Sequence, residues 1–244
     1  MSEPKAFRLP FIKKEKVAKD TYSFYFNQAE LGLDFIPGQY IRMNLPIANP
    51  DERGVSRQFT IASSPLEKNH IMITTKIIKA SFKKKLLTLQ IGEMVDFFGP
   101  LGGFIFDETK KEERVFLAGG IGITPFHSMI AYANGKNLSI PITLFVSFST
   151  VDEMVFYEEM MGIANKNPNI KIVYTITKPE ESQEKWNGEV GRISGVLIKK
   201  YVSDIFKPLY YIVGPPLMVS EIEETVIKMG ISNNKIFIEN FTGY

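Results

Sequence analysis

The segment LAGGIGITPF, residues 117–126, decides how the second half of this chain folds. It follows a short apolar run at 114–118 and opens a helix-like stretch at 125–133. Its three glycines permit a tight turn and a close approach to a ligand, because no Cβ stands in the way. Thr124 is a suitable helix N-cap and Pro125 a suitable first residue, so free N–H groups would face the turn. The segment lacks the Gly-x-Gly-x-x-Gly spacing, but it predicts an anion site suited to a dinucleotide diphosphate.

Downstream of this segment, strand-like and helix-like stretches alternate. The strands are apolar almost throughout, as is typical of a parallel sheet that is covered on both faces. We expect strands at 142–149, 169–177, 208–214 and 236–240, and helices at 153–166, 194–201 and 216–229.

Upstream, short alternating strands are separated by turn residues, which predicts an all-β barrel or sandwich. These strands are expected at 21–27, 38–46, 57–65, 70–78 and 93–99. The charged stretch DETKKEE, residues 107–113, marks the change of pattern. The predicted fold class is therefore two-domain, with an antiparallel β-barrel at 1–106 followed by a Rossmann-like α/β domain with a parallel sheet at 107–244.

The chain contains no cysteine and only two histidines, His70 and His127. It therefore offers no disulfide, no catalytic thiol and no thiolate ligands for zinc or an iron–sulfur cluster. We expect no metal site, and we interpret His127 as a partly buried helix residue. Any redox chemistry must depend on an organic cofactor or on a partner protein.

Charge is distributed unevenly between the two halves. Residues 1–105 hold 15 Lys and Arg against 10 Asp and Glu, whereas residues 106–244 hold 14 against 17. The basic half is either ordinary solvated surface or a surface that steers an acidic protein partner. No interleaving of basic and aromatic residues indicates nucleic acid, and no apolar run approaches the roughly 18 residues of a membrane span. With a charged N-terminus, the sequence favours a cytoplasmic location.

Two further motifs combine with the glycine-rich segment. RQFT, residues 57–60, offers an Arg for phosphate, an aromatic ring for stacking and a hydroxyl for a ring nitrogen. Taken alone, that pattern is more often strand packing. VGPPLM, residues 213–218, ends a strand and restarts a helix with a Gly-Pro-Pro turn.

In this order, the three motifs closely resemble those of the ferredoxin–NADP reductase superfamily, and the resemblance spans nearly the whole chain. RQFT is similar to its Arg-x-Tyr-Ser/Thr motif, GGIGITP to Gly-Gly-x-Gly-x-Thr-Pro, and VGPPLM to Cys-Gly-Pro-Pro-x-Met. The resemblance implies a flavin-binding Greek-key β-barrel followed by an NAD(P)-binding α/β domain. Phe59 replaces the usual Tyr, and Val213 replaces the Cys often found near the nicotinamide.

The resemblance also implies residue roles. Arg57 would hold the flavin phosphate or diphosphate, Phe59 would pack on the isoalloxazine, and a helix expected at 82–89 would offer its N-terminus to a phosphate. The implied catalytic residues are Thr60, Thr124 and Glu239. The implied cofactor-binding residues are Arg57, Gln58, Phe59, Thr60, Thr75, Lys76, Ala80, Ser81, Gly119, Gly120, Gly122, Thr124, Pro125, Ser147, Gly214, Pro215, Met218, Phe241 and Tyr244, with Phe241 or Tyr244 shielding the flavin.

The implied activity is hydride transfer from the nicotinamide C4 of NAD(P)H to flavin N5. Electrons would then pass to a separate acidic carrier such as ferredoxin, or to an oxygenase component. FAD is the family's usual cofactor and FMN the alternative. Segment 147–150 lacks the Arg that pairs with the 2′-phosphate in NADP-specific members, which favours NADH, although Arg192 or Lys178 could supply that charge.

Three alternatives remain open at this point. The chain could be an electron-transfer subunit that is inactive outside a larger redox complex. It could instead reduce a quinone, free flavin or ferric complex directly. A module that binds nucleotide but no flavin is the third alternative.

Overall fold

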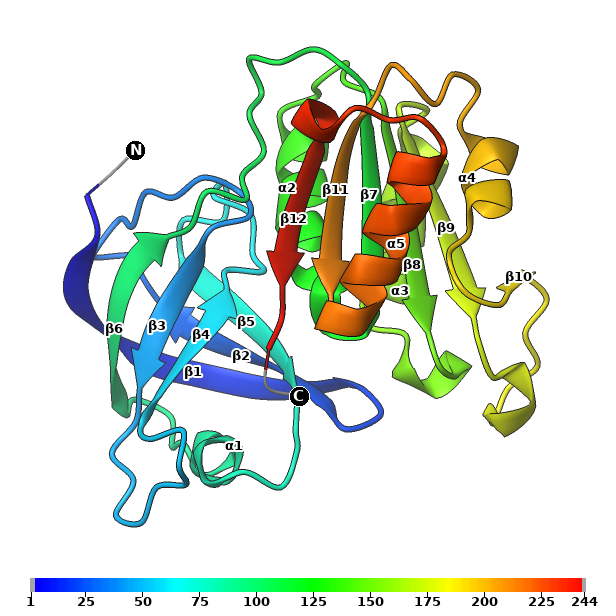
Figure 1. Cartoon of the computed structure of the whole chain (residues 1–244). Helices are drawn as coiled ribbons and strands as arrows, with labels where there is room; N and C mark the ends of the chain where they lie inside the picture. The colour runs from blue at the N-terminus through cyan, green and yellow to red at the C-terminus, as the bar shows by residue number, and fades with distance from the viewer. Residues whose placement is uncertain (1–2, 243–244) are drawn as a thin grey trace.

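A computed structural model describes residues 3–242 and places them in two domains, each built on a six-stranded sheet (Figure 1). Because the chain passes from one sheet to the other between Leu101 and Arg114, we propose the boundary at 106/107. No helix among residues 3–242 combines the length and the apolar character that crossing a bilayer requires.

The N-terminal domain is an antiparallel sheet in the order β4-β3-β6-β1-β2-β5. The backbone N–H of Ala62 donates to the carbonyl of Met72 (2.7 Å) and so links the segments of the two edge strands. This architecture confirms the predicted antiparallel barrel. Its elements are β1 (Lys5–Ala18), β2 (Thr21–Asn27), β3 (Tyr40–Asn44), β4 (Ser56–Thr60), β5 (His70–Lys76), α1 (Ser81–Leu87) and β6 (Met94–Leu101).

Strand β1 was not predicted, although it has 14 residues and lies inside the sheet. Its charged second half and Pro10 hide the alternation of buried Phe7, Leu9 and Phe11. The strand pairs with β6 as far as Pro10 and with β2 from Phe11 onward. Pro10, which has no N–H to donate, therefore lies where β1 changes partner.

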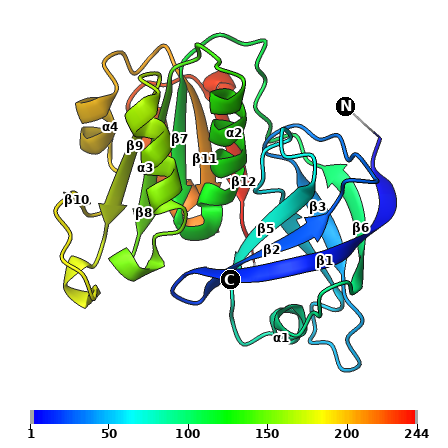
Figure 2. The same ribbon diagram turned by 180° about the vertical axis from the view of Figure 1, so that it is seen from behind.

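The C-terminal domain is a parallel sheet in the order β10-β9-β8-β7-β11-β12. Helices α4 and α5 cover one face (Figure 1), and α2 and α3 cover the other (Figure 2), as predicted for an α/β domain. Its elements are β7 (Arg114–Gly119), α2 (Ile123–Gly135), β8 (Ile142–Phe148), α3 (Tyr157–Lys166), β9 (Ile170–Ile176), β10 (Glu189–Val190), α4 (Gly195–Tyr201), β11 (Leu209–Gly214), α5 (Pro216–Lys228) and β12 (Ile236–Asn240).

The helix after the glycines begins earlier than the sequence predicted. A 3₁₀ turn at Gly120–Gly122 leads directly into α2, so Gly122 is the N-cap and Thr124 lies inside the helix. The Thr124 hydroxyl donates to the carbonyl of Ile121 (3.0 Å) instead of capping the helix. The prediction of Thr124 as N-cap was wrong because glycine allows the tight turn to continue straight into the helix.

The two domains are joined by polar contacts of α2. His127 Nδ1 lies 2.7 Å from the carbonyl oxygen of Ala62, and the Ser128 hydroxyl donates to the carbonyl of Ser63 (2.7 Å). His127 Nε2 lies 3.0 Å from a carboxylate oxygen of Glu159. Burial alone would lower the pKa of His127, but the Glu159 carboxylate outweighs burial and raises it. Both ring nitrogens face acceptors, so the imidazolium form fits this interface.

We expect His127→Gln to make domain docking less dependent on pH. Because the histidine pKa is higher in the folded chain, its stabilisation is complete below the ordinary value of about 6.5 and is lost as the pH rises through the folded value. The variant should be less stable than the parent by about 2 kcal/mol at pH 5.5 and by less at pH 9, as measured by urea unfolding. Ser128→Ala is the matched control, since its deficit should be the same at both pH values. A pH-independent deficit for His127→Gln would contradict this prediction.

Candidate functional site

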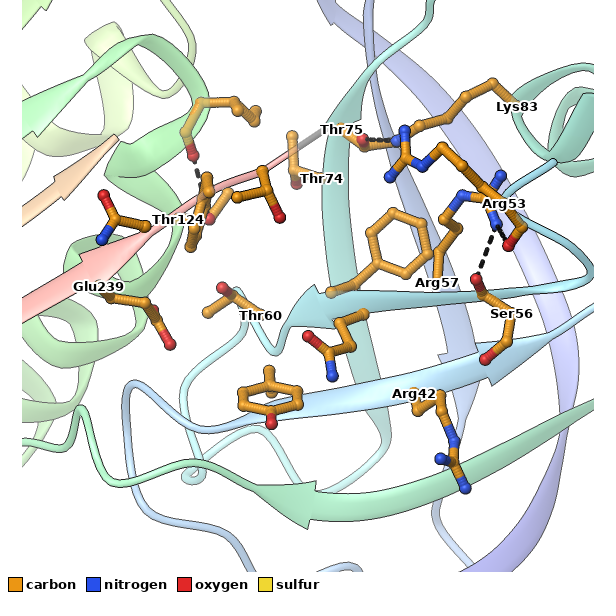
Figure 3. A pocket seen from close by; sticks show the side chains of 17 residues that line it. Arg42, Arg53, Ser56, Arg57, Thr60, Thr74, Thr75, Lys83, Thr124 and Glu239 are labelled. Atoms are coloured by element: carbon orange, nitrogen blue, oxygen red, sulfur yellow. Dashed lines mark hydrogen bonds between the residues drawn. The ribbon is translucent and has the colours of Figure 1, made fainter. Parts of the chain in front are cut away.

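A cavity of about 350 Å³ opens where the barrel meets the carboxyl edge of the parallel sheet (Figure 3). Strands β3, β4 and β5 and helix α1 form its barrel side, and the turn after β7, the first turn of α2 and the end of β12 with the residues after it form its α/β side. Its lining residues are Tyr40, Arg42, Arg53, Ser56, Arg57, Gln58, Phe59, Thr60, Thr74, Thr75, Lys83, Ile121, Thr124, Glu239, Asn240, Phe241 and Thr242.

One end of the cavity carries hydroxyl groups and a carboxyl group. Thr60 ends β4, Thr124 lies in the first turn of α2, and Glu239 lies in β12 opposite Val213 of β11. The structure thus brings the three residues that were predicted as catalytic to the same cavity, from three separate elements.

Glu239 has an unusual environment for an acid. One of its carboxyl oxygens, Oε2, is buried and has no hydrogen-bond partner among the described residues. Burial raises the pKa of Glu239 to about 7. An unpartnered buried oxygen costs free energy unless a ligand or water satisfies it, so this acid is a candidate contact for a polar ligand group.

Glu239→Gln tests this environment. Because the folded pKa lies above the unfolded value of about 4.5, the folded chain binds the extra proton between the two values. The parent should therefore lose stability as the pH rises from about 4.5 to about 7, and the Gln variant should lack this loss. Urea unfolding should show that the free energy of unfolding of Glu239→Gln rises relative to that of the parent between pH 5 and pH 8. Glu158→Gln, an exposed carboxylate on α3, should follow the parent, and a Glu239→Gln variant that does the same would refute the prediction.

The opposite end of the cavity is cationic, with Arg42, Arg53, Arg57 and Lys83 around it (Figure 3). Arg57 is buried, and its Nη1 donates to the carbonyls of Arg53 (2.7 Å), Gly54 (3.0 Å) and Ser56 (2.8 Å). Its Nη2 forms an ion pair with a carboxylate oxygen of Asp51 at 2.8 Å. Arg57 therefore holds the loop before β4 in place at the cationic wall.

Residues 80 and 81 lie outside this cavity. The hydroxyl and backbone N–H of Ser81 donate to Asp51, at 2.8 and 3.1 Å. The N–H of Ser81 at the start of α1 is therefore bonded to a side chain of the same domain, and phosphate binding by residues 80 and 81 stays a prediction. Lys83, two residues further along α1, lines the cavity. The sequence signal for it was three consecutive lysines, 83–85, in a short helix where the dipole disfavours cations near the N-terminus.

A second cavity, of about 290 Å³, lies over the glycine-rich turn and shares Ile121 with the first. The predicted residues Gly119, Gly120, Ser147, Pro215 and Met218 line it, together with Lys76 from the barrel. Lys76 forms an ion pair there with Glu153 at 2.8 Å. A Cβ at Gly119 would stand 2.0 Å from Sδ of Met218, so any larger residue there would force the Met218 side chain to move from the floor of this cavity.

The predicted Gly122 and Pro125 line neither of these two cavities, and Gly122 packs against the end of β11. Phe241 lines the first cavity, whereas Tyr244 lies outside the described residues. The predicted Thr75 lines the first cavity. The predicted Gly214 lies beside the glycine-rich turn, because a Cβ added to it would stand 3.3 Å from the backbone nitrogen of Gly119.

A third cavity, of about 400 Å³, continues from the second and shares Ser147, Thr177, Pro215 and Met218 with it. Its wall holds Arg192, whose Nη1 forms an ion pair with Glu221 at 2.6 Å. Lys178 pairs with Glu181 at 2.9 Å and lines none of the three cavities. The second and third cavities together form a groove along the carboxyl edge of the parallel sheet.

These features fit a flavin dinucleotide in the first cavity and a nicotinamide dinucleotide in the groove. A planar aromatic wall at Phe59, a cationic end and a hydroxyl-lined end suit the ring, the diphosphate and the polar edge of a flavin. The glycine floor suits a diphosphate close to the backbone. Among residues 3–242, no group of three acidic or histidine side chains could hold a metal ion.

Two family models match the chain. The Oxidoreductase FAD-binding domain matches residues 8–106, and the Oxidoreductase NAD-binding domain matches residues 116–224. The first match covers the barrel that carries the first cavity, and the second covers the glycine-rich turn and most of the groove.

Curated relatives and solved structures are similar over most of this chain. The glycine betaine monooxygenase reductase subunit of Chromohalobacter salexigens is 26% identical over 91% of this chain and 60% of its own length. NADH-cytochrome b5 reductase 1 of Debaryomyces hansenii is 25% identical over 93% and 80%. The crystal structure of a ferredoxin NADP+ reductase from Neisseria gonorrhoeae, with bound FAD and NADP, superposes with a TM-score of 0.79 at 18% identity, covering 97% of this chain and 98% of that one. The chain spans between 49% and 80% of the length of the curated relatives it matches.

Proposed function

Because the chain belongs to the ferredoxin–NADP reductase superfamily, as an FAD-binding domain followed by an NAD-binding domain, we propose that it oxidises NADH through bound FAD and delivers the electrons to a separate acceptor. One observation carries the proposal: the first cavity and the groove along the parallel sheet meet at Ile121. Two ligands that meet at this wall would be held in contact, which is the main requirement for hydride transfer.

The chain contributes binding and orientation. A bound flavin supplies the capacity to accept a hydride and to release electrons singly or in pairs. Thr60 and Thr124, both buried, line the first cavity, and the Thr124 hydroxyl donates to the carbonyl of Ile121, the residue that the two cavities share. Glu239, with its unpartnered oxygen, supports a contact with the amide of a nicotinamide there. The carboxyl therefore orients a ligand, and the transfer itself requires no acid or base from the chain.

The groove favours NADH over NADPH. Ser147 lines both parts of the groove, and no arginine stands at 147–150. Among the described residues that line the third cavity, Arg192 is the one arginine. It forms an ion pair with Glu221, which lines the same cavity. The 2′-phosphate of NADPH would have to compete with the Glu221 carboxylate for Arg192, so this ion pair disfavours binding of NADPH.

We further propose that the acceptor is an acidic electron-carrier protein or an oxygenase component. The excess of basic residues in the barrel half supports an acidic partner. One relative is named as the reductase subunit of a monooxygenase, which also fits a protein acceptor. Since nicotinamide nucleotides are held inside cells, a cytoplasmic location forms part of the proposal.

Steady-state assays test this function. The full chain, loaded with FAD, is expected to oxidise NADH with ferricyanide as an artificial acceptor and to reduce an acidic ferredoxin in a salt-sensitive manner. Reduction of quinone or free flavin that exceeds ferredoxin reduction and is insensitive to salt would favour a small-molecule acceptor. Absence of NADH oxidation with every acceptor would contradict the proposed function.

A further inference from the structure

Lys83 is a buried lysine without an acidic partner. Its side chain is 8% exposed, its Nζ donates to the hydroxyl of Thr75, and the same nitrogen lies 4.8 Å from the ring centre of Phe59. No carboxylate among residues 3–242 lies within ion-pair distance of it. A buried ammonium normally requires a counter-charge, so this position is built for an anion that the chain does not itself provide.

The charged groups around Lys83 do not supply that anion. Arg53 and Arg57 face it from the loop before β4 and from β4 itself, and both disfavour a further positive charge. The acid on this side, Asp51, is bound to Arg57 and Ser81. Lys85 on the same helix turns away to pair with Glu93 at 3.1 Å. Glu239 belongs to the hydroxyl-lined end of the cavity, as Figure 3 shows, and Lys84 is exposed.

Arg57, the arginine of the RQFT motif, already uses both of its terminal nitrogens within the barrel. Arg57 gives Nη1 to three backbone carbonyls and Nη2 to Asp51. The Lys83 side chain lies on the cavity wall, and among the described residues its Nζ forms one hydrogen bond, to the hydroxyl of Thr75. An ammonium group has three N–H donors, so further donors remain for a ligand.

Burial, together with the positive charges of Arg53 and Arg57, lowers the pKa of Lys83 to about 7. The amine of the ligand-free chain is therefore largely neutral at pH 8. A phosphate beside it would favour the charged form and move the pKa back up.

We propose that Lys83 binds the diphosphate of FAD and that it takes up one proton from solvent when FAD binds. The inference rests on the proposed function, because it assumes a flavin dinucleotide in the first cavity. The proton moves from water or buffer to the Lys83 amine, and no other bond changes.

Calorimetry of the full chain, stripped of flavin and titrated with FAD in buffers of different ionisation enthalpy, measures this proton directly. FAD suits the test because its diphosphate is esterified at both ends and keeps its charge between pH 6 and pH 8, whereas the FMN monoester titrates near pH 6. For a group of pKa about 7 that becomes fully charged on binding, uptake should be about 0.9 proton per FAD at pH 8 and about 0.1 at pH 6, and Kd should rise about tenfold from pH 6 to pH 8.

Lys83→Met isolates the contribution, since it keeps the length and the apolar stem of the side chain but cannot ionise. It should bind FAD about tenfold more weakly at pH 6 and should lose the proton uptake at pH 8. Lys84→Met, on the exposed side of the same helix, is the matched control and should behave like the parent. Glu239→Gln removes the other group of the cavity that titrates near pH 7 and should keep the uptake.

The outcomes separate the two claims. A parent chain that binds FAD without proton uptake, or a Lys83→Met variant that retains it, overturns the role of Lys83 and leaves the proposed function standing. A parent chain that binds no FAD at any pH would contradict the proposed function, and with it the role of Lys83. Titration with NADH in place of FAD should give the same proton uptake for the parent and for Lys83→Met. Proton uptake with NADH that depends on Lys83 would mean that the lysine binds NADH and not FAD, which overturns the proposal.

Discussion

Gly122→Ala is expected to destabilise the α/β domain by about 3 kcal/mol or more and to abolish binding of the nicotinamide dinucleotide. A Cβ at this position would stand 2.6 Å from the carbonyl oxygen of Val213, 3.0 Å from its carbonyl carbon and 3.1 Å from Cα of Gly214. All three are backbone atoms of β11, the strand hydrogen-bonded to β7 and β12. They cannot move aside without breaking the sheet, and the turn that forms the floor of the groove would be displaced with it.

Urea unfolding and nucleotide binding measure this effect. The matched control is Gly162→Ala in α3, where an added Cβ meets no heavy atom within 4 Å. Alanine in a helix is favoured over glycine by up to about 1 kcal/mol, so this variant should match or exceed the parent in stability. A Gly122→Ala variant that unfolds at the parent's urea midpoint would show that the turn after β7 is not packed against β11 as closely as described.

Arg57→Lys is the second substitution with a large expected effect. Lysine keeps the charge, but a single ammonium cannot reproduce the four contacts that the guanidinium makes with Asp51 and with the carbonyls of Arg53, Gly54 and Ser56. The loop before β4 would lose its anchor, and the cationic end of the cavity would lose its shape. We expect the affinity for FAD to fall about 100-fold, or about 2.7 kcal/mol.

Titration of the flavin-free full chain with FAD, followed by flavin fluorescence, measures the loss. Arg42→Lys is the control, because Arg42 lines the same cavity but is exposed and its guanidinium stacks 4.9 Å from the ring centre of Phe98. It should change the affinity by less than about threefold. An Arg57→Lys variant that binds FAD within about threefold of the parent, as Arg42→Lys should, would mean that charge alone, and not the anchored loop, determines flavin binding.

Features encoded locally could be predicted from the sequence. The glycine-rich turn, the strand before it and the helix after it follow from a few neighbouring residues, and the change from alternating to continuous apolar strands separated the two domains. The convergence of Thr60, Thr124 and Glu239 required more, because they lie on three elements and come together only through the docking of two domains. The family resemblance, and not the spacing, brought them into one site.

Other features depend on information that local patterns do not contain. Lys83 rather than Ser81 lines the cavity because the phase of α1 is set by Phe82 and Leu86, which are buried in the barrel core. The role of His127 depends on Glu159 in a different helix and on a carbonyl of the other domain. In neither case does the neighbouring sequence indicate which side chain faces which partner.

The central claim is that NADH reduces a flavin held in this cavity. Anaerobic stopped-flow mixing of the FAD-loaded full chain with NADH or with NADPH, followed in the visible absorption band of the flavin, tests it most directly. The account predicts rapid loss of the band with NADH and a lower rate with NADPH at the same concentration, because Glu221 competes with the 2′-phosphate for Arg192. A flavin that stays oxidised with both nucleotides would contradict the account.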